Sequence, residues 1–478
     1  MMNVEVFSGD APVVPAVAVL YYEGQDMSKI WGGAAETAAR HFGAIGRKNE
    51  WFRFPSLDGG AEVFLVGLGK KKDVPTGAVR DGVAETVRRL GALGIAQAAV
   101  IFPDGLDEDL SAAAAEGAVL GNYRFDRFRT PKEGDRTVPM ESLFLMGGHQ
   151  SAVDRGVILG RAQTEARDLA NRPGNDITPQ TLAERAQKIA EETGLECEIW
   201  DETKIQAEGM SALWHVGKGS QTPPRFIHMI YRPKERAKKK VVFVGKGITF
   251  DSGGLCIKNR VGIRTMKCDK TGGCNVLAIM KAVAALTPDI EVHGVVGAAE
   301  NMPDGAAYRP DDIVRAKNGK TIEIVNTDAE GRVTLADSLS FASELQPDVI
   351  VDMATLTGAA VTALGNYTAG LLCDHDDLSR AIMDAGCRAG ERFHHFTMDD
   401  DKLREQIDSP VADLLNSGGP GGGMITAGMF LKEFVNPDIP WAHLDIAAVD
   451  FYEKPFGCYG KGASAFGVRT CLEYIRSL

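Results

Sequence analysis

The chain has 478 residues, of which 44% are hydrophobic and 25% charged, as in ordinary globular proteins, and this composition excludes disordered and fibrous classes. The net charge of -12 argues against nucleic acid as the main partner. The N-terminus carries no signal-peptide pattern, and no segment offers about 18 uninterrupted apolar residues. We therefore expect a cytoplasmic protein without a membrane partner.

Apolar runs alternate with amphipathic stretches through the first 150 residues. This pattern predicts helices at 31–42, 79–93 and 108–120, and strands at 16–22, 61–67, 98–102 and 142–145. Alternation of this kind indicates a sheet covered by helices. The region contains no cluster of Asp, Glu and His, so we expect a separate α/β domain over residues 1–150 that does not carry the chemistry.

A long helix over 151–168 is predicted to link this domain to the rest of the chain. Pro173 ends the helical pattern, and Thr178 followed by Pro179 is typical of a capped helix start with proline at its first position. The sequence therefore predicts a linker and junction at 151–180 and a larger C-terminal domain over 181–478.

A first cluster of charged side chains follows a predicted buried strand at 241–244. Its glycine-rich loop is expected to carry Lys246, Asp251, Lys258 and Asp269, before a helix that starts near residue 271. The basic run 232–240 just upstream is interpreted as the solvated end of a hairpin, with an anion-binding site as the alternative.

A second cluster lies in the stretch V-N-T-D-A-E-G-R-V-T-L over 325–335. The residues before it are typical of a buried strand and those after it of a helix. Asp328 and Glu330 would then point to one side of an extended chain, and Gly331 would allow a sharp turn after them. Taken alone, this stretch also fits a solvated acidic loop.

The two clusters together change the interpretation. Four carboxylates and two lysines on loops after apolar strands could not be desolvated together without a cation to balance them. We therefore predict a metal site, in which lysine can be a ligand only as the neutral amine. A set of carboxylates and lysine without His suits Mg²⁺, Mn²⁺ or Zn²⁺. The alternative of thiolate ligands rests on three nearby cysteines: Cys256, Cys268 and Cys274.

Further strands are predicted at 291–299, 348–355 and 441–447, with helices between them. The segment 356–360 follows the strand at 348–355, at the carboxyl end where ligands bind in open α/β sheets. A glycine-rich stretch at 418–423 fits either close packing or a lid. These elements predict one crevice shared with the metal loops.

Three motifs carry a resemblance to a known family: V-G-K-G-I-T-F-D-S-G-G-L-x-I-K, M-K-x-D and N-T-D-A-E-G-R. They resemble the signature of the leucyl aminopeptidases, also called cytosol aminopeptidases, of peptidase family M17. The resemblance runs from about residue 166 to the C-terminus. It implies an α/β fold with a smaller N-terminal macro-like domain and a larger C-terminal mixed-sheet α/β/α catalytic domain.

The family resemblance also implies a reaction, in which a metal-dependent aminopeptidase releases N-terminal amino acids from peptides through a water or hydroxide held by two metals. One cation would be held by Lys246, Asp251, Asp269 and Glu330, and the other by Asp251, Asp328 and Glu330. The metals would be Mn²⁺ or Zn²⁺, with Mg²⁺ also open. A homohexamer is implied as well.

Roles for other residues follow from the same resemblance. Lys258 would donate to the developing oxyanion, and Arg332 would hold a bicarbonate that relays protons. The side-chain pocket and peptide alignment would come from Met266, Thr355, Leu356 and Gly358. From the residues alone, Arg332 could instead pair with a surface acid.

The chain departs from the family pattern at Lys270 and Gly273, in the stretch A-S-A-F-G-V-R, and at Asp450. Asp450 stands where relatives carry a small or apolar residue, so it would favour a cationic N-terminal side chain if it faces the pocket. Turned to solvent, it would have no such role. Two other functions stay open: phosphoester hydrolysis at a dimetal site, and a DNA-associating role known for some relatives.

Overall fold

The computed structural model describes residues 2–7, 13–28, 30, 34–54, 60–71, 76–130 and 137–478. It has two compact units. The N-terminal unit comprises Met1–Thr164 together with Tyr452–Lys461, and the C-terminal unit comprises Glu165–Phe451 and Gly462–Leu478. Both are α/β, as predicted.

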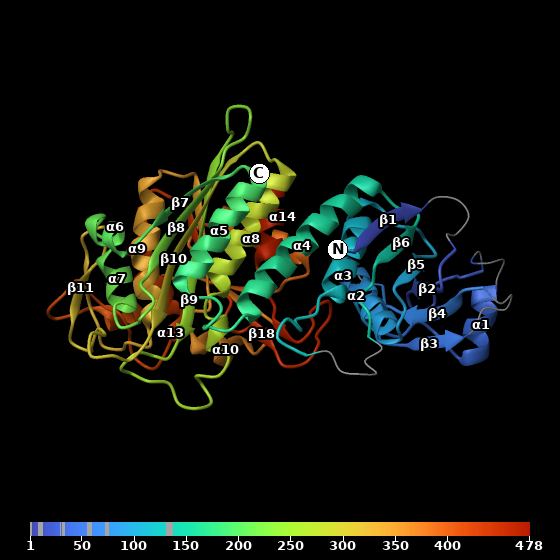
Figure 1. Cartoon of the computed structure of the whole chain (residues 1–478), viewed down its shortest axis with the longest axis horizontal. Coiled ribbons are helices and arrows are strands. Elements are labelled where there is room, and N and C mark those ends of the chain that lie inside the picture. The colour runs from blue at the N-terminus through green and yellow to red at the C-terminus, as the bar shows by residue number, and fades with distance from the viewer. Residues whose placement is uncertain are drawn as a thin grey trace. The chain divides into compact units, whose positions relative to one another are not determined.

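A six-stranded sheet forms the centre of the N-terminal unit, in the order β1-β6-β5-β2-β4-β3 (Figure 1). All neighbours are parallel except β3, which is antiparallel to β4. The strands are β1 (Asn3–Phe7), β2 (Ala16–Tyr21), β3 (Trp51–Phe54), β4 (Glu62–Gly67), β5 (Gln97–Ile101) and β6 (Ser142–Met146). The four predicted strands are confirmed; β1 and β3, at the two edges, were not predicted.

The helices of this unit are α1 (Ala34–Phe42), α2 (Thr76–Ala92), α3 (Glu108–Asn122) and most of α4 (Gln150–Asn171). They match the predicted helices, although residues 31–33 of the first lie outside the described residues. Strand β2 is buried along its whole length, because a parallel sheet with both faces covered has no wet side.

An eight-stranded mixed sheet forms the centre of the C-terminal unit, in the order β15-β14-β17-β13-β9-β10-β8-β7. Strands β10, β9, β13 and β17 are parallel to one another, and β7, β8 and β14 introduce antiparallel pairs. The strands are β7 (Glu196–Trp200), β8 (Arg225–Tyr231), β9 (Lys240–Asp251), β10 (Glu291–Asn301), β13 (Val349–Ala354), β14 (Ala369–Leu372), β15 (Phe393–Phe396) and β17 (Trp441–Asp445).

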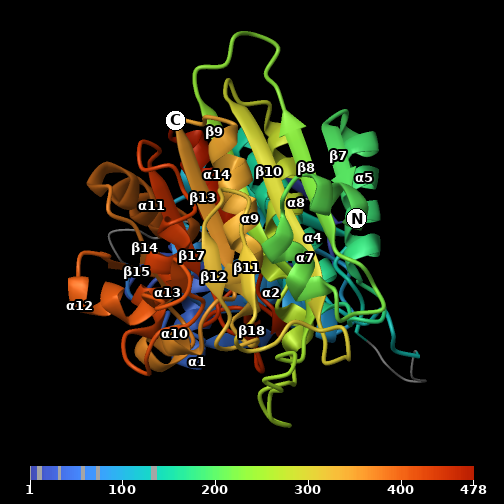
Figure 2. The ribbon, with the colours of Figure 1, turned by 90° about the vertical axis from the view of Figure 1, so that its left-hand side faces the viewer.

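Helices cover both faces of this sheet (Figures 1 and 2). A Cβ at Gly294 of β10 would lie 2.6 Å from Met280 of α8, whereas one at Gly297 would lie 2.8 Å from Ser338 of α9, so α8 and α9 lie on opposite faces. The helices are α5 (Pro179–Thr193), α6 (Glu202–Ala207), α7 (Ser211–Gly217), α8 (Thr271–Leu286), α9 (Glu330–Glu344), α10 (Gly358–Leu364), α11 (Asp376–Ala389), α12 (Asp401–Arg404), α13 (Gly423–Lys432) and α14 (Val468–Arg476).

Two small sheets complete the unit: β11 (Ile313–Arg315), β12 (Thr321–Glu323) and β16 (Leu414–Leu415) form one, and β18 (Phe451–Tyr452) and β19 (Gly462–Ala463) the other. The strand expected before Asp328 is β12, which ends at Glu323 and lies outside the large sheet. Val325, expected to be buried, is 39% exposed. The prediction of a strand running directly into the acidic pair is therefore wrong in detail.

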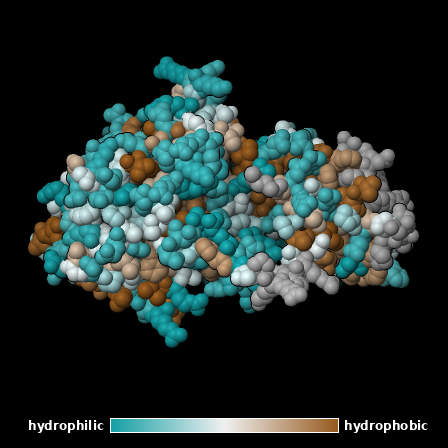
Figure 3. All heavy atoms as spheres, in the orientation of Figure 1, coloured by the Kyte–Doolittle hydropathy of each residue, from teal (hydrophilic) through white to brown (hydrophobic). Residues whose placement is uncertain are grey.

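The basic run 232–240 joins β8 to β9 and projects as a hydrophilic loop at the top of Figures 1 and 3. It is exposed, as expected, but it does not close a hairpin, because β10 lies between β8 and β9. None of the helices in the described part of the chain combines the length and apolar character needed to cross a membrane.

Candidate active site

Strand β9 carries the first two charged side chains of the site. The sequence predicted that a loop would begin near Gly245, but β9 continues unbroken through Lys246 to Asp251. The prediction failed because glycine was taken to end the strand, whereas here it allows close packing: a Cβ at Gly245 would lie 2.4 Å from the carbonyl oxygen of Gly272 in α8. Lys246 is therefore held by a central strand.

The remaining charged side chains come from connections at the same end of the sheet. Lys258 lies in the loop after β9, and Asp269 directly follows a short 3₁₀ helix (Met266–Cys268). Asp328 lies in a turn, and Glu330 is the first residue of α9. The predictions that one helix begins near residue 271 and another after residue 330 are confirmed.

Three carboxylates meet at one point. One oxygen from each of Asp251, Asp328 and Glu330 lies within 4.8 Å of the other two. Asp251 and Glu330 are only 2% and 1% exposed, and the Asp328 side chain is 32% exposed. Buried like charges at this spacing require a cation between them.

The two lysines lie on either side of this cluster. Lys246 Nζ is 2.8 Å from Asp269 Oδ1 and 2.9 Å from Glu330 Oε1. Lys258 Nζ is 2.7 Å from Asp251 Oδ2 and 2.5 Å from Asp328 Oδ1. All six side chains predicted for the metal site and oxyanion are therefore brought together.

The pKa values reflect the burial of these charges. Desolvation, followed by the charge of Asp251, raises the pKa of Glu330 to about 8. Desolvation also raises the pKa of Asp269 and of Asp328. Burial alone would lower the pKa of Lys246, but Asp269 and Glu330 outweigh it and raise that pKa. Glu330, Asp269 and Asp328 are thus costly to ionise without a nearby cation.

Glycine is needed at position 331 because a larger residue has no room there, and not because the chain turns sharply. It lies in α9 and has no positive φ, which corrects the expectation of a sharp bend. A Cβ here would lie 2.4 Å from Lys246 Cε and 2.6 Å from its Nζ. Glycine therefore lets the lysine pass directly over the first turn of α9.

Neutral side chains that sequence reasoning missed support the cluster. Asn301, the last residue of β10, donates from Nδ2 to Asp251 Oδ1 at 2.8 Å and to the Thr327 carbonyl at 3.0 Å. Thr327 Oγ1 donates to the Gly253 carbonyl and accepts from the Cys256 N–H. The Asn301 side chain lies at the carboxyl end of the strand next to β9, which is the signal that could have identified it.

Arg332 is 8% exposed and donates from Nη1 to the Asn416 carbonyl at 3.1 Å. Its Nε has no hydrogen-bond partner among the described residues, and burial lowers its pKa to about 10. The alternative of a surface ion pair is thus wrong, because the guanidinium is inside the protein and no described carboxylate pairs with it.

Two of the predicted pocket residues, Met266 and Thr355, contact Asp269. Thr355 Oγ1 donates to Asp269 Oδ1 at 2.8 Å, and the Asp269 N–H donates to the Met266 carbonyl. The Leu356 N–H donates to Asp445 Oδ1 at 3.2 Å. Gly358 begins α10, and a Cβ there would meet nothing within 4 Å, so open space lies beside it.

The arrangement fits divalent cations. Asp269 Oδ2 and Glu330 Oε2 are buried and have no hydrogen-bond partner among the described residues, so each has an oxygen available as a ligand. The cysteines do not join this set: burial raises the pKa of the Cys274 thiol to about 12, and that of Cys268 well above its ordinary value. The thiolate alternative is therefore not supported.

Asp450 and Lys270 lie next to this cluster. Asp450 is 7% exposed, and desolvation raises its pKa to about 7, whereas a hydrogen bond from the Thr271 side chain opposes the shift. Its Oδ1 has no partner among the described residues. Lys270 is fully buried, and its Nζ donates to the carbonyls of Lys267 and Arg172. Asp450 is thus not turned to solvent.

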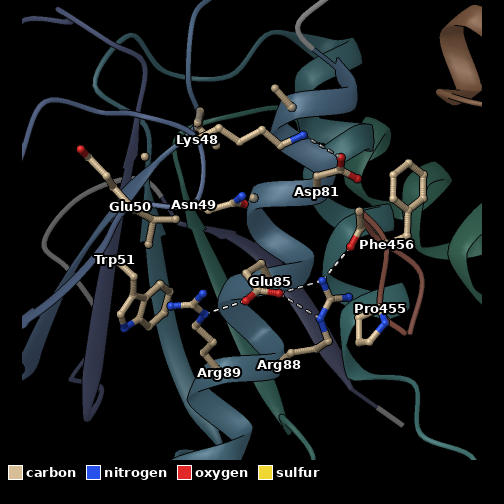
Figure 4. A pocket seen from close by; sticks show the side chains of 16 residues that line it. Lys48, Asn49, Glu50, Trp51, Asp81, Glu85, Arg88, Arg89, Pro455 and Phe456 are labelled. Atoms are coloured by element: carbon tan, nitrogen blue, oxygen red, sulfur yellow. Dashed lines mark hydrogen bonds and ion pairs between the residues drawn. The ribbon is translucent and has the colours of Figure 1, made fainter. Parts of the chain in front are cut away.

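A separate cavity of about 530 Å³ lies within the N-terminal unit. Trp51 and Phe456 lie on two of its sides, and Glu85 binds both Arg88 and Arg89 on α2 (Figure 4). Its charged groups pair largely with one another, and it contains no cluster of metal-ligand type.

Family models match both parts of the chain. Residues 164–472 match the catalytic domain of the cytosol aminopeptidase family, peptidase family M17, and residues 16–132 match that family's N-terminal domain. The chain belongs to the cytosol aminopeptidase family. It is therefore a hydrolase of the aminopeptidase class, as the motifs predicted.

Relatives in this family cover nearly the whole chain. A probable cytosol aminopeptidase of Aquifex aeolicus (strain VF5) is 50% identical over 99% of this chain and 98% of its own length. A probable cytosol aminopeptidase of Persephonella marina (strain DSM 14350 / EX-H1) is 43% identical over 99% of both chains.

Solved structures agree with the fold. The bottromycin maturation enzyme BotP, in complex with Mn, is 36% identical with a TM-score of 0.88, over 97% of this chain and 99% of its own. A mutant of tomato leucine aminopeptidase is 31% identical with a TM-score of 0.89, over 100% of this chain and 97% of its own. The mixed α/β architecture of a cytosol aminopeptidase is thereby confirmed.

Proposed function

We propose that this cytosol aminopeptidase releases N-terminal residues from peptides at a site holding two divalent cations. One cation would bind Lys246, Asp251, Asp269 and Glu330, and the other Asp251, Asp328 and Glu330. The observation that carries the proposal is the buried cluster in which Asp269 Oδ2 and Glu330 Oε2 lack partners. The Mn in the BotP complex supports Mn²⁺, and Zn²⁺ or Mg²⁺ suits the same oxygens.

Cations bound here would polarise the scissile carbonyl and lower the pKa of water toward about 7. Lysine is a metal ligand only as the neutral amine, so Lys246 would lose a proton when the site is loaded. Bound metal would neutralise the carboxylates that raise the pKa of Lys246. The Lys246 amine would then lose its proton more readily.

Lys258 is proposed to stabilise the oxyanion. Its ammonium lies at the accessible side of the cluster, with the side chain 17% exposed, and Asp251 and Asp328 fix it from two directions. A donor of this kind contributes about 2.7 to 4 kcal/mol to transition-state stabilisation. Lys258 therefore acts on the reacting carbonyl, whereas Lys246 holds the cluster together.

Arg332 and the Thr355–Gly358 segment complete the proposed machinery. The buried guanidinium has an unpartnered Nε and could bind bicarbonate, whose role would be to relay protons. The Leu356 carbonyl and the open space at Gly358 would align the peptide, while Met266 and Thr355 line the side-chain pocket beside Asp269. We further propose a cytoplasmic homohexamer, as the family resemblance implies.

A substrate screen tests this proposal. The purified chain, with Mn²⁺ added, should hydrolyse aminoacyl amides and leave N-acetylated amides and phosphomonoesters intact. Loss of activity with chelator and its return with Mn²⁺ would support the metal requirement. Hydrolysis of phosphomonoesters in preference to amides would overturn the proposal, and light scattering after size-exclusion chromatography would measure the oligomer.

A further inference from the structure

The cavity of about 530 Å³ in the N-terminal unit is lined by residues that the proposed function does not use. Its walls come from β3, the end of β4, α2 and the segment 455–457 (Figure 4). Phe456, which is 45% exposed, and the buried Leu68 are among its apolar lining residues. Pockets for small ligands have volumes of about 300 to 1,000 Å³. The cavity is therefore large enough to hold one.

The charged side chains that line the cavity are balanced in sign. Three are cationic and three are anionic: Lys48, Arg88, Arg89, Glu50, Asp81 and Glu85. Desolvation would raise the pKa of Glu85, but hydrogen bonds from Arg89 and Arg88 outweigh it and lower that pKa, so Glu85 is ionised. A ligand of high net charge, such as a nucleotide, gains little from this balance, whereas a ligand that carries both signs can match it.

Three of these charged groups are engaged in building the walls. Glu85 accepts from Arg89 Nε at 2.6 Å and from Arg88 Nη2 at 2.9 Å. The same Arg88 nitrogen donates to the Gly457 carbonyl at 2.7 Å, which holds the segment 455–457 against α2. Glu50 Oε2 accepts from the backbone N–H groups of residues 45–47. Glu85, Arg88 and Glu50 therefore shape the cavity.

Asp81 and Arg89 keep hydrogen-bonding capacity that the described part of the chain does not use. Asp81 accepts no hydrogen bond there, and its nearest cation, Lys48 Nζ, is 4.0 Å from Oδ2 on a side chain that is 68% exposed. Arg89 engages Glu85 through Nε only, and its guanidinium carbon lies 4.9 Å from the centre of the Trp51 ring. The side chains of Asp81 and Arg89 are 32% and 39% exposed, so a ligand can reach both.

The spacing of these two groups along α2 fits a short peptide. Eight residues separate them, which is about 12 Å along the helix axis, and their side chains can lean toward one another. An extended dipeptide or tripeptide spans about 7 to 10 Å, whereas a single amino acid spans about 3.5 Å. The termini of a short peptide can therefore reach both groups at once.

Asn49 supplies a group that suits the peptide bond. It has a left-handed φ of 71°, and in Figure 4 its amide lies between the Lys48–Asp81 pair and Glu85. An asparagine amide both donates and accepts hydrogen bonds, as a peptide group does. A peptide held at its two ends would thus find a partner for its middle.

We propose that this cavity binds a dipeptide or tripeptide with free termini, with its ammonium at Asp81, its carboxylate at the Nη groups of Arg89 and its peptide group at Asn49. The site belongs to the N-terminal unit and is separate from the metal cluster. The inference therefore goes beyond the proposed function and does not depend on it.

Calorimetric titration of the dipeptide Leu-Phe into the full-length chain tests this proposal, with chelator present so that the probe is not hydrolysed. N-acetyl-Leu-Phe and Leu-Phe-amide are the matched probes, because each keeps both side chains and loses one terminal charge. Each should bind about fivefold more weakly than Leu-Phe, or worse, since each loses one charged hydrogen bond.

Two variants identify which end binds where. In Asp81→Asn, Leu-Phe should bind no better than its N-acetyl form, and in Arg89→Gln no better than its amide, because the partner of that terminus is gone. Asp104→Asn and Arg53→Gln are the controls. Both remove charges of the same unit that do not line the cavity, and both should keep the wild-type order of affinities. Circular dichroism verifies that each variant is folded.

Several results would overturn the proposal. One is a Kd for Leu-Phe weaker than about 1 mM in the wild type, and another is an affinity that neither acetylation nor amidation changes. Equal binding of all three probes to wild type and both variants would show that any bound peptide lies elsewhere. Displacement of Leu-Phe by a lower concentration of AMP would assign the cavity to a phosphate-bearing ligand instead. If Arg89→Gln does not fold, the three probes on the wild type and on Asp81→Asn still decide the outcome.

Discussion

Replacing Gly331 with alanine perturbs the cluster without changing any proposed ligand. The added Cβ would lie 2.4 Å from Lys246 Cε and 2.6 Å from Nζ, well inside normal contact, so the lysine or α9 has to move. Overpacking of this kind costs about 1 to 3 kcal/mol. The helix gains back about 0.5 to 1 kcal/mol from replacing glycine by alanine, so the net loss of stability should be up to about 2.5 kcal/mol.

The larger effect should fall on metal binding. Lys246 Nζ lies within 2.9 Å of both Asp269 and Glu330, and a shifted amine no longer matches the geometry at either oxygen. We expect Gly331→Ala to lower metal affinity by roughly tenfold to a hundredfold, the size seen when groups that orient ligands are changed. Activity at limiting Mn²⁺ should fall with it and recover in part at high Mn²⁺.

The measurement combines urea unfolding, elemental analysis and amide hydrolysis as a function of Mn²⁺. Gly77→Ala is the matched control, because Gly77 lies in α2 and its Cβ would meet nothing within 4 Å; it should keep full metal content and stability. If Gly331→Ala binds Mn²⁺ as tightly as the wild type, the placement of Lys246 over α9 is not needed for the site, and the reasoning fails.

Three further predictions concern the same cluster. Lys258→Ala should keep two metals but lose about a hundredfold to a thousandfold in kcat, and a fully metallated variant with unchanged kcat would remove Lys258 from the oxyanion role. Asp251→Asn and Glu330→Gln should each lose metal, since each removes a proposed bridge between two cations, and elemental analysis showing two metals in either would refute that bridging. Burial raises the pKa of Glu330 to about 8 and that of Asp337 to about 7, so the folded chain holds protons there that the unfolded chain loses near pH 4 to 4.5. Stability of the chelated protein should therefore fall as pH rises from about 6.5 to 8, and a urea midpoint that rises over this range would contradict it.

The charge pattern of the sequence predicted which side chains meet at the site, because acids and lysines are seldom buried unless they lie next to one another. Lys246, Asp251, Asp269 and Glu330 all converge as expected. The elements that carry them were less predictable. Glycines in β9 suggested a loop, but Gly245 marks a place where α8 approaches the strand, and only the packing of the two elements distinguishes these cases.

The neutral residues that support the charged cluster were not predicted, for a different reason. Asn301 holds Asp251 through one hydrogen bond, and Thr327 holds the loop after β9 through two; such residues occur throughout any chain. Their importance depends on β10 ending level with β9, which is a property of strand register. Long-range register is not encoded in local periodicity. The place of Asn301 at the end of a predicted strand could have marked it as a candidate, but its contact with Asp251 could be established only in the folded structure.

Two of the departures from the family pattern, Lys270 and Asp450, lie far apart in the sequence, yet each affects the other's ionisation in the fold. Burial lowers the pKa of the Lys270 amine and raises that of Asp450, so either charge alone would be expensive inside the protein. Together they offset one another without touching, because Lys270 is occupied by two backbone carbonyls. The Lys270 charge thus favours the ionised form of the buried Asp450 carboxyl from a distance, without an ion pair in direct contact.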